Sequence, residues 1–288
     1  MRNVGPVLAI LGALLAIWYL AVIPMNAPWT YDQAARAGTT VTFREVIADT
    51  MSQERPKLPA PHQVLAELKK TVIDTKVTSK RSLVYHAGVT LGATLTGFLA
   101  GTFLGIFFAI AVVRSRTAEL GFMPWAIISQ TIPIVALAPM IVVLSNKIGI
   151  EGRLVPKTLI SAYLSYFPVF VSMVKGLRSP DAMQLDLLKT YGASEGQVFR
   201  KLRLPASLPF FFASMKIAMA ASLVGVIVAE LPTGAVQGLG ARMLIGSQFG
   251  QPLIMWAALV AASVLAAGLI LVVTVIEKGL SRAMGVRG

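Results

Sequence analysis

The stretch AGVTLGATLTGFLAGTFLGIFFAIAVV, residues 87–113, decides the fold class because it contains no charged side chain. A helix needs about 20 predominantly apolar residues to cross a hydrocarbon core about 30 Å thick. Inside lipid, a spanning segment must satisfy its own backbone hydrogen bonds, which an α-helix does. The stretch therefore predicts a membrane-spanning α-helix.

Five further segments have a comparable length and apolar character: residues 4–24, 120–145, 158–174, 208–231 and 253–276. Only Lys216 and Glu230 carry a charge inside the six segments. The 288 residues are 56% hydrophobic and 14% charged, whereas soluble domains are typically about 25% charged. Short alternating segments typical of transmembrane β-strands are absent. We expect an all-α polytopic membrane protein with six transmembrane helices.

The remaining composition narrows the possible chemistry. The chain has no cysteine, which excludes disulfides, thiolate metal sites and cysteine nucleophiles. His62 and His86 are the only histidines and leave little for metal chemistry. The net charge of +13 comes from Lys and Arg residues that flank apolar segments, so it indicates membrane topology and no nucleic-acid partner.

Charge distribution predicts the orientation. Lys and Arg are enriched in short cytoplasmic loops. In this chain most Lys and Arg residues of the short loops fall on the side that holds both termini. The segment 26–86 lies on the other side although it is also basic, because loops of about 60 residues count weakly in this rule. Both termini are therefore expected to be cytoplasmic.

The chain divides into three parts. Residues 1–25 form the first transmembrane helix, 26–86 an extracytoplasmic segment, and 87–288 a five-helix core with a cytoplasmic loop at 176–207. In the second part, Pro59 and Pro61 can open a short amphipathic helix. An alternative reading makes the first helix a secretory signal cut near Asn26, although its apolar run exceeds the usual core of such signals.

Small residues recur every four positions in the second predicted span: Ala93, Gly97, Gly101, Gly105 and Ala109. Such a stripe lets a neighbouring helix approach closely within the bilayer. Tight helix packing is the favoured interpretation, and a hinge at the glycines is the alternative.

The third predicted span is interrupted by Pro133 and Pro139, with Gln130 and Thr131 beside the first proline. A proline removes a hydrogen bond from the helix. At membrane depth the freed backbone groups are tolerated only where protein or a water-filled cavity surrounds them. Gln130, Thr131 and Pro133 are therefore candidates for a translocation pathway.

The fifth predicted span supplies two more candidates, Ser222 and Glu230, for the pathway or its gate. Glu230 lies at the outer end of the span, where it can contact an external partner at an outer gate or instead face a cavity. Lys216 lies toward the cytoplasmic end and is expected to extend its ammonium to the interface.

A polar loop, LRSPDAMQLDLLKTYGASEGQVFRKLRLPASLP at residues 177–209, contains many helix start and stop signals. Ser179 can cap a first short helix, and Gly192 can end it in the left-handed conformation. Ser194 can cap a second helix, which Pro205 is expected to stop. On the first helix one face is apolar, formed by Met183, Leu187, Leu188 and Tyr191. Either lipid headgroups or a partner must cover that face.

This loop resembles the signature of binding-protein-dependent ABC importer permeases. The signature reads Glu-Ala-Ala, three residues, Gly, nine residues, Ile, one residue, Leu-Pro. The matching residues here are Asp186, Leu187, Leu188, Gly192, Leu202, Leu204 and Pro205. Asp186 stands for the glutamate, and two leucines replace the two alanines, so the detailed docking fit differs from the family pattern.

The resemblance extends over most of the chain after the first span. Its motifs look like those of the nitrate, sulfonate, taurine and bicarbonate permease group, to which pyrimidine-precursor importers also belong. They are residues 58–65 (LPAPHQVL), 130–133 (QTIP), 192–194 (GAS), 229–230 (AE) and 238–240 (GLG). Each motif is weak alone, but their order and spacing are specific.

The resemblance implies a type I importer in the bacterial inner membrane that takes up a small anion or a pyrimidine-type precursor by alternating access. Its other parts would be a second permease subunit, identical or different, two cytoplasmic ATPase subunits and an extracytoplasmic solute-binding protein. The coupling residues carried over are Asp186, Leu187, Leu188, Tyr191, Gly192, Ala193, Leu204 and Pro205. This chain has no G-x-x-x-x-G-K-[ST] loop, so ATP and Mg²⁺ are expected on a partner, with no cofactor here and no enzyme activity of its own.

Three other classes fit the sequence less well. A membrane hydrolase would need a base beside a nucleophile such as Ser247, and neither histidine lies inside a span. A secondary transporter more often shows internal repeats and ionisable residues near mid-membrane. A channel would be expected to show a ring of charges or a selectivity loop. A secondary transporter or channel that is not coupled to ATP is the main alternative.

Overall fold

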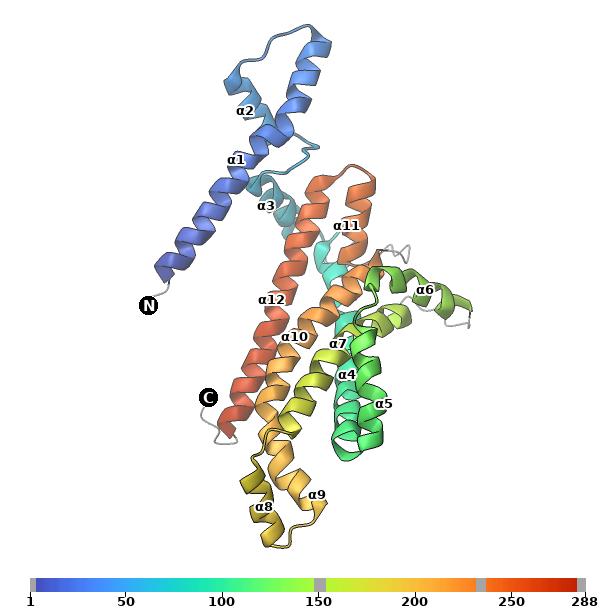
Figure 1. Ribbon diagram of the computed structural model, residues 1–288. Helices are drawn as coiled ribbons and strands as arrows, with labels where there is room; N and C mark the ends of the chain where they lie inside the picture. The colour runs from blue at the N-terminus through green and yellow to red at the C-terminus, as the bar shows by residue number, and fades with distance from the viewer. Residues whose placement is uncertain (1–3, 148–153, 232–236, 284–288) are drawn as a thin grey trace. The chain divides into compact units, whose positions relative to one another are not determined.

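The computed structural model describes residues 4–147, 154–231 and 237–283, and this part of the chain is helical without any β-strand (Figure 1). The helices are α1 Val4–Ala37, α2 Phe43–Ser52, α3 Pro61–Lys69, α4 Leu83–Arg114, α5 Arg116–Ser129, α6 Ile134–Lys147, α7 Leu154–Leu177, α8 Ala182–Thr190, α9 Glu195–Val198, α10 Leu204–Glu230, α11 Leu239–Gln248 and α12 Pro252–Ala283. Two π-helical turns, Lys70–Asp74 and Phe199–Arg203, extend α3 and join α9 to α10. The all-α prediction is confirmed.

Helices long and apolar enough to cross a membrane occur where the sequence predicts them. Five meet the requirement by themselves: α1, α4, α7, α10 with its N-terminal extension, and α12. The sixth candidate is the pair α5 and α6, which meet at an angle of 103°. The break in the third predicted span is therefore confirmed at Pro133, whereas α6 continues through Pro139.

The described residues fall into two compact units. The first contains residues 4–87 and 241–262, and the second contains residues 88–240 and 263–283. In the first unit α1 runs to Ala37, well past the predicted end at residue 24. Polar contacts with the following segment hold these extra turns, so tertiary structure overrides the two prolines inside the helix.

A buried amide fixes the segment after α2 against α1. Asn26 Nδ2 donates to the carbonyl oxygens of Leu58 at 2.9 Å and Thr50 at 3.2 Å, and Leu58 N donates back to Asn26 Oδ1. Gln53 Nε2 donates to Asp49 Oδ2 at 2.9 Å and to Thr30 Oγ1 at 3.1 Å. Because these groups are buried, each lost bond would leave an unsatisfied polar group, so the loop is held in one conformation.

The same unit contains the turn between α11 and α12. The rings of Trp18 and Trp256 lie 5.1 Å apart and pack α1 on α12. Trp18 Nε1 also donates to Pro59 O at 3.0 Å. The α2–α3 loop and the α11–α12 turn are thus parts of one unit.

The number of candidate spans follows from helix length and composition. Five helices qualify by themselves, and the bent α5–α6 pair makes a sixth if it counts as one span. The six expected spans agree with the larger of these two counts.

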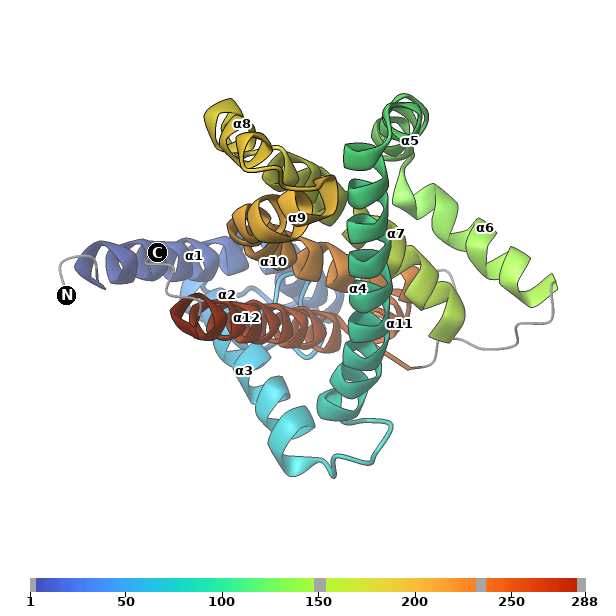
Figure 2. The same cartoon turned by 90° about the horizontal axis from the view of Figure 1, so that it is seen from below.

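In the second unit α4 packs closely on α7 along the small-residue stripe. A Cβ placed on Gly101 would lie 2.7 Å from Ala162 O, and one on Gly105 would lie 2.7 Å from Tyr166 O. Ala93 and Ala109 are fully buried. The predicted packing role of the stripe is confirmed, and α7 lies in turn beside α10 (Figure 2).

Lys216 makes a contact that the sequence analysis does not predict. Its Nζ lies 2.6 Å from Glu277 Oε2, and both side chains are partly exposed. The ammonium is thus neutralised by α12, and the ion pair connects α10 with α12. Its extension to the membrane interface stays a prediction.

We predict that Gly101→Ala destabilises the protein, because the added methyl group would meet the backbone of α7. The expected loss is about 1–3 kcal/mol, as for other overpacked cores. Thermal unfolding of the detergent-solubilised protein measures it. Gly92→Ala on the same helix is the control, since a Cβ there meets nothing within 4 Å; equal stability of the two variants would contradict the packing.

Candidate functional site

The predicted coupling loop forms a helical hairpin at one end of α7 and α10 (Figure 1). Asp181 N donates to Gln184 Oε1 at 3.3 Å at the start of α8. Gly192 has φ of +70°, which permits the sharp turn after α8. Ser194 Oγ then accepts from Gln197 N and caps α9. The predicted left-handed glycine and the second cap are confirmed.

Two boundaries of the hairpin differ from the prediction. The cap of α8 is Asp181 and not Ser179, whose hydroxyl donates to Gly176 O at the end of α7. Pro205 does not stop the second helix, because it lies at the junction where the π-helical turn Phe199–Arg203 runs into α10. The helical path therefore continues from Glu195 to Glu230.

Three apolar side chains at α8 are largely uncovered by the described residues. Met183 and Tyr191 are each 80% exposed and Leu187 is 55% exposed, while Leu188 and Ala193 are partly buried. Asp186, Leu204 and Pro205 are exposed as well. No residue of α8 is buried. The hairpin therefore presents an aromatic and aliphatic surface that needs a lipid or protein partner.

The break between α5 and α6 brings together three predicted pathway residues. Gln130, Thr131 and Pro133 are all exposed there. Ser129 anchors the break to α7 by two hydrogen bonds. Its hydroxyl oxygen lies 2.6 Å from the hydroxyl oxygen of Tyr166, and its carbonyl accepts a hydrogen bond from the hydroxyl of Tyr163. The first N–H groups of α6 have no carbonyl partner within that helix, so this region is suited to a polar environment.

An apolar cavity of about 250 Å³ lies beside the break. Its lining includes Phe108, Phe122, Trp125 and Phe170, with Ser129 and Tyr166 as the polar groups. This cavity has no local sequence signal, because its aromatic residues are spread over three helices.

Ser222 is separate from the break and lies fully buried between helices. Its hydroxyl donates to Thr94 O at 2.8 Å, and Ser161 Oγ lies 2.5 Å from Ser222 Oγ. The side chain thus joins α10 to α4 and α7. Its role in a pathway stays a prediction.

Glu230 belongs to a buried polar cluster at the end of α10. Lys157 Nζ donates to Glu230 Oε1 at 2.9 Å, and the two side chains are 4% and 0% exposed. Thr90 Oγ1 donates to the same carboxylate at 3.1 Å, and Gly240 N donates to Oε2 at 2.8 Å. Leu239 N in turn donates to Thr90 Oγ1. The carboxylate therefore holds the start of α11 against α4, α7 and α10.

Two glycines make this arrangement possible. Gly238 has φ of +124°, and a Cβ on it would collide with the Glu230 carboxylate. A Cβ on Gly240 would lie 2.5 Å from Ile227 O. The glycines of the 238–240 motif are thus required by close approach of the backbone to Glu230.

Sequence reasoning identified Glu230 but missed Lys157 and Thr90. Lys157 directly precedes the predicted span 158–174 and looks there like an ordinary loop charge. A cation before one span and an anion at the end of another are the one signal that could have suggested the pair. The enclosed carboxylate cannot contact an external partner while the ion pair is closed, and its gate role stays a prediction.

A family model described as the binding-protein-dependent transport system inner membrane component matches residues 101–286, which include the break, the hairpin and Glu230. The chain belongs to this family. The recognised resemblance is confirmed, and the protein is a multi-pass inner-membrane permease subunit of an ABC importer. Among the described residues no group of side chains could hold a metal ion.

Curated relatives agree with the family. A probable ABC transporter permease of Haemophilus influenzae is 31% identical over 77% of this chain and 85% of its own length. The formylaminopyrimidine transport permease ThiX of Halalkalibacterium halodurans is 30% identical over 64% of this permease and 68% of its own length. The taurine permease TauC of Escherichia coli is 26% identical over 67% of each chain.

For the buried cluster of this permease we predict that Lys157→Met costs about 3–5 kcal/mol, because it leaves the Glu230 carboxylate buried without its cation. Glu230→Gln combined with Lys157→Met should cost less than the sum of the single changes. Thermal unfolding of the four proteins in detergent gives the coupling energy. Strictly additive effects would show that the two side chains do not depend on each other.

Proposed function

We propose that this permease imports a small solute by ATP-driven alternating access, with the α8–α9 hairpin as its contact to a cytoplasmic ATPase. The observation that carries the proposal is the uncovered side chains of Met183, Leu187 and Tyr191 on a hairpin between two spans. Hydrophobic and aromatic residues of this kind anchor protein interfaces.

The partners follow from the family and from what the sequence lacks. No phosphate-binding G-x-x-x-x-G-K-[ST] loop is present, so the ATPase subunits are the ones that bind ATP and Mg²⁺, and this chain needs no cofactor. We propose two such subunits, a second permease subunit and an extracytoplasmic solute-binding protein, in a bacterial inner membrane with both permease termini cytoplasmic. This orientation places the hairpin on the ATPase side.

The hairpin connects α7 directly to the helix that continues as α10. Force on α8 therefore reaches both helices that carry the Ser161–Ser222 and Lys157–Glu230 contacts. α7 also holds the α5–α6 break through its two tyrosines. We propose that ATP-driven movement of the hairpin opens and closes a pathway at Gln130, Thr131 and Pro133, with Ser222 and Glu230 controlling the outer part.

The substrate class follows from the relatives. Those named above include permeases for formylaminopyrimidine and for taurine, and we propose a small sulfonate-, nitrate- or bicarbonate-like anion or a pyrimidine-type precursor. Selection among these is assigned to the binding protein on which the family depends.

To test the coupling contact, we predict that Leu187→Ala combined with Tyr191→Ala lowers recovery of the ATPase subunits. Loss of an interface anchor worth about 2 kcal/mol corresponds to roughly thirtyfold weaker binding. Affinity purification of the tagged permease from its native cells, with identification of the subunits and an ATPase assay, measures the loss. Lys189→Ala, on an exposed position off this face, is the matched control.

Gly192→Val supplies an independent test, measured as solute uptake by the cells. A β-branched residue at positive φ distorts the turn, whereas Gly192→Asn is tolerated because asparagine adopts this conformation. Uptake should be lost only in the valine variant. Normal uptake by Gly192→Val would contradict the coupling role. In the purification, a permease that is recovered alone and transports without ATP would contradict the proposed importer function and favour a secondary transporter or channel.

To test the pathway, we predict that cysteines introduced at Gln130 and Thr131 react with a small hydrophilic thiol reagent at least tenfold faster than one at Phe103. The natural chain has no cysteine, so every label comes from the introduced residue. Phe103 is 71% exposed on the middle of α4 and serves as the lipid-facing control. Labelling rates in membrane vesicles measure the difference, and equally slow reaction at all three positions would exclude water at the break.

A further inference from the structure

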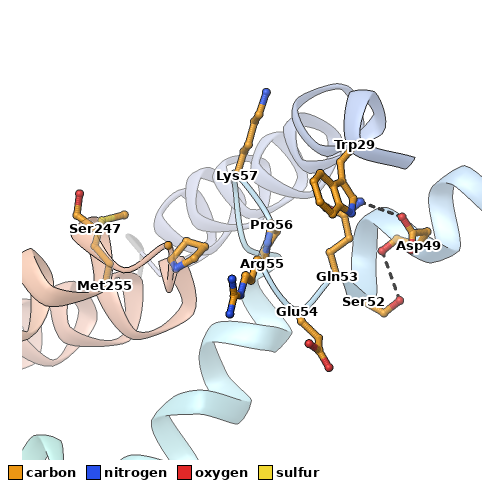
Figure 3. Close-up of a pocket in the computed structure, with 13 residues that line it drawn as sticks. Trp29, Asp49, Ser52, Gln53, Glu54, Arg55, Pro56, Lys57, Ser247 and Met255 are labelled. Atoms are coloured by element: carbon orange, nitrogen blue, oxygen red, sulfur yellow. Dashed lines mark hydrogen bonds between the residues drawn. The ribbon is translucent and has the colours of Figure 1, made fainter. Parts of the chain in front are cut away.

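Two of the cavities differ in what they can select. The larger one, of about 810 Å³, lies in the first unit between the α2–α3 loop and the α11–α12 turn (Figure 3). Its lining contains two acidic and two basic side chains, Asp49, Glu54, Arg55 and Lys57. A cleft attracts a charged ligand when one sign of charge lines it, so this cavity favours no ligand charge. The smaller cavity, beside the α5–α6 break, has a uniform lining that points to one ligand class.

Aromatic rings from three helices surround the smaller cavity, which has a volume of about 250 Å³. We call it the aromatic cavity, bounded by Phe108, Phe122, Trp125, Tyr166 and Phe170. The ring centroid of Phe108 on α4 lies 4.9 Å from that of Phe122 on α5 and 6.5 Å from that of Tyr166 on α7. Phe170 is fully buried, whereas Trp125 is 73% exposed. The cavity therefore extends from the core to the surface beside Trp125.

The size and walls of the aromatic cavity suit a single flat ring. Drug-sized ligands occupy cavities of about 300–1,000 Å³, and the aromatic cavity is smaller than that. Aromatic side chains bind other π-systems by offset stacking or by edge-to-face contact. A planar ring can thus contact several walls at once, whereas a compact tetrahedral group meets them with few atoms.

The lining of the aromatic cavity disfavours an anion. Among the described residues that line it, none carries a charge. Moving an ionised group from water into an apolar site is costly unless a charge or hydrogen-bond donors compensate it. A nitrate or a sulfonate would lose its hydration in this cavity without a cation in return. A neutral ligand is therefore favoured.

The direction of the hydrogen bonds at Ser129 determines which polar group faces the ligand. Ser129 Oγ donates to Ala126 O at 2.8 Å, and a hydroxyl has one hydrogen to donate. In the 2.6 Å contact between the two hydroxyl groups, Tyr166 is therefore the donor and Ser129 the acceptor. Because the hydrogen of Tyr166 is used in this way, its Oη is left as an acceptor. A ligand with an N–H group complements it.

This acceptor distinguishes the aromatic cavity from a groove filled by lipid. An acyl chain has no donor, so it would cover the Tyr166 oxygen without a hydrogen bond from the ligand side. The cavity also adjoins the proposed pathway, because Ser129 lines the cavity and is followed directly by the exposed Gln130 and Thr131. A solute at the break is thus next to the cavity.

We propose that the aromatic cavity is a solute site of the permease, and that it takes a neutral, planar heteroaromatic ring with an amino group. Tyr166 Oη accepts a hydrogen bond from the amino group, and the surrounding aromatic rings contact the heterocycle. This inference rests on the proposed function and deepens it, because it selects the pyrimidine-type precursor over the small anion. The binding protein makes a first selection and the cavity makes a second.

The first test measures binding of 4-aminopyrimidine to the full-length permease in lipid nanodiscs. The chain has four tryptophans, and Trp18→Phe, Trp29→Phe and Trp256→Phe together leave Trp125 as the only fluorescent reporter. The expected result is saturable quenching with half-saturation on the order of millimolar, since a site on a pathway must also release its solute.

Competing solutes decide the ligand class in the same assay. Taurine and nitrate test an anion, and choline tests a quaternary ammonium ion, which aromatic cages also bind. None of the three should displace 4-aminopyrimidine at equal concentration. Displacement by any of them would overturn the proposal. Saturable quenching that occurs in detergent but not in lipid would also overturn it, because an acyl chain would then be the occupant.

The second test isolates the acceptor. Tyr166→Phe keeps the ring and removes the oxygen, so it should lower the preference for 4-aminopyrimidine over pyrimidine, which lacks the amino group, about fivefold. Tyr163→Phe is the matched control, because it also loses a hydrogen bond to Ser129 but does not line the cavity. Its preference should equal that of the natural residue. An unchanged preference in Tyr166→Phe would overturn the proposal.

The third test fills the cavity. Ala126 lines it and is 8% exposed, so Ala126→Leu should occupy the space and weaken binding of 4-aminopyrimidine about tenfold. Ala126→Ser adds one small atom and is the control. Thermal unfolding in detergent shows that both variants are folded. Unchanged binding by folded Ala126→Leu would overturn the proposal, because the ligand would then lie elsewhere.

Failure of these tests is distinguishable from failure of the proposed function, because the binding measurements need neither ATPase subunits nor a binding protein. Recovery of ATPase subunits by a permease that does not bind 4-aminopyrimidine would overturn the heteroaromatic site and leave the importer in place. Binding of 4-aminopyrimidine by a permease that recovers no ATPase subunit would support the site and contradict ATP-driven import.

Discussion

The close approach of α4 to α7 is the contact on which the rest of the core depends. Lipid tails are as apolar as the side chains, so helices in a bilayer associate through packing and polar contacts. Gly97, Gly101 and Gly105 bring the backbone of α4 onto α7. About two turns from Gly97 along α4, Thr90 and Lys157 reach Glu230. Ser161, which faces Gly97, meets Ser222. The helix spacing therefore sets the geometry of both polar clusters.

The packing of α4, α7 and α10 connects the proposed ATPase contact to the buried polar groups. The α8–α9 hairpin extends from α7 and α10 with an exposed apolar face. Within the same unit Glu230 holds the start of α11 against α4, α7 and α10. The hairpin is thus connected to helices that share this packing, which gives a physical route for coupling.

Several elements could be predicted because their cause is local. Apolar length located every span, Pro133 located the break, and Gly192 located the left-handed turn of the hairpin. Other features depended on residues distant in the sequence. Pro205 reads locally as a helix stop, yet it opens α10 after a π-helical turn. The partner of Glu230 could not be identified because Lys157 lies 73 residues away and resembles an ordinary loop charge.

The sequence by itself determined that the chain is an all-α membrane protein, that the stripe on α4 packs tightly, and that the hairpin follows a permease signature. Those properties depend on composition, short-range periodicity and local backbone preferences. Tertiary structure alone decided that Lys157 neutralises Glu230, that Ser222 joins three helices, and that the α2–α3 loop and the α11–α12 turn line one cavity. These features require contacts between distant segments, and they exist only once the helices have packed in one register.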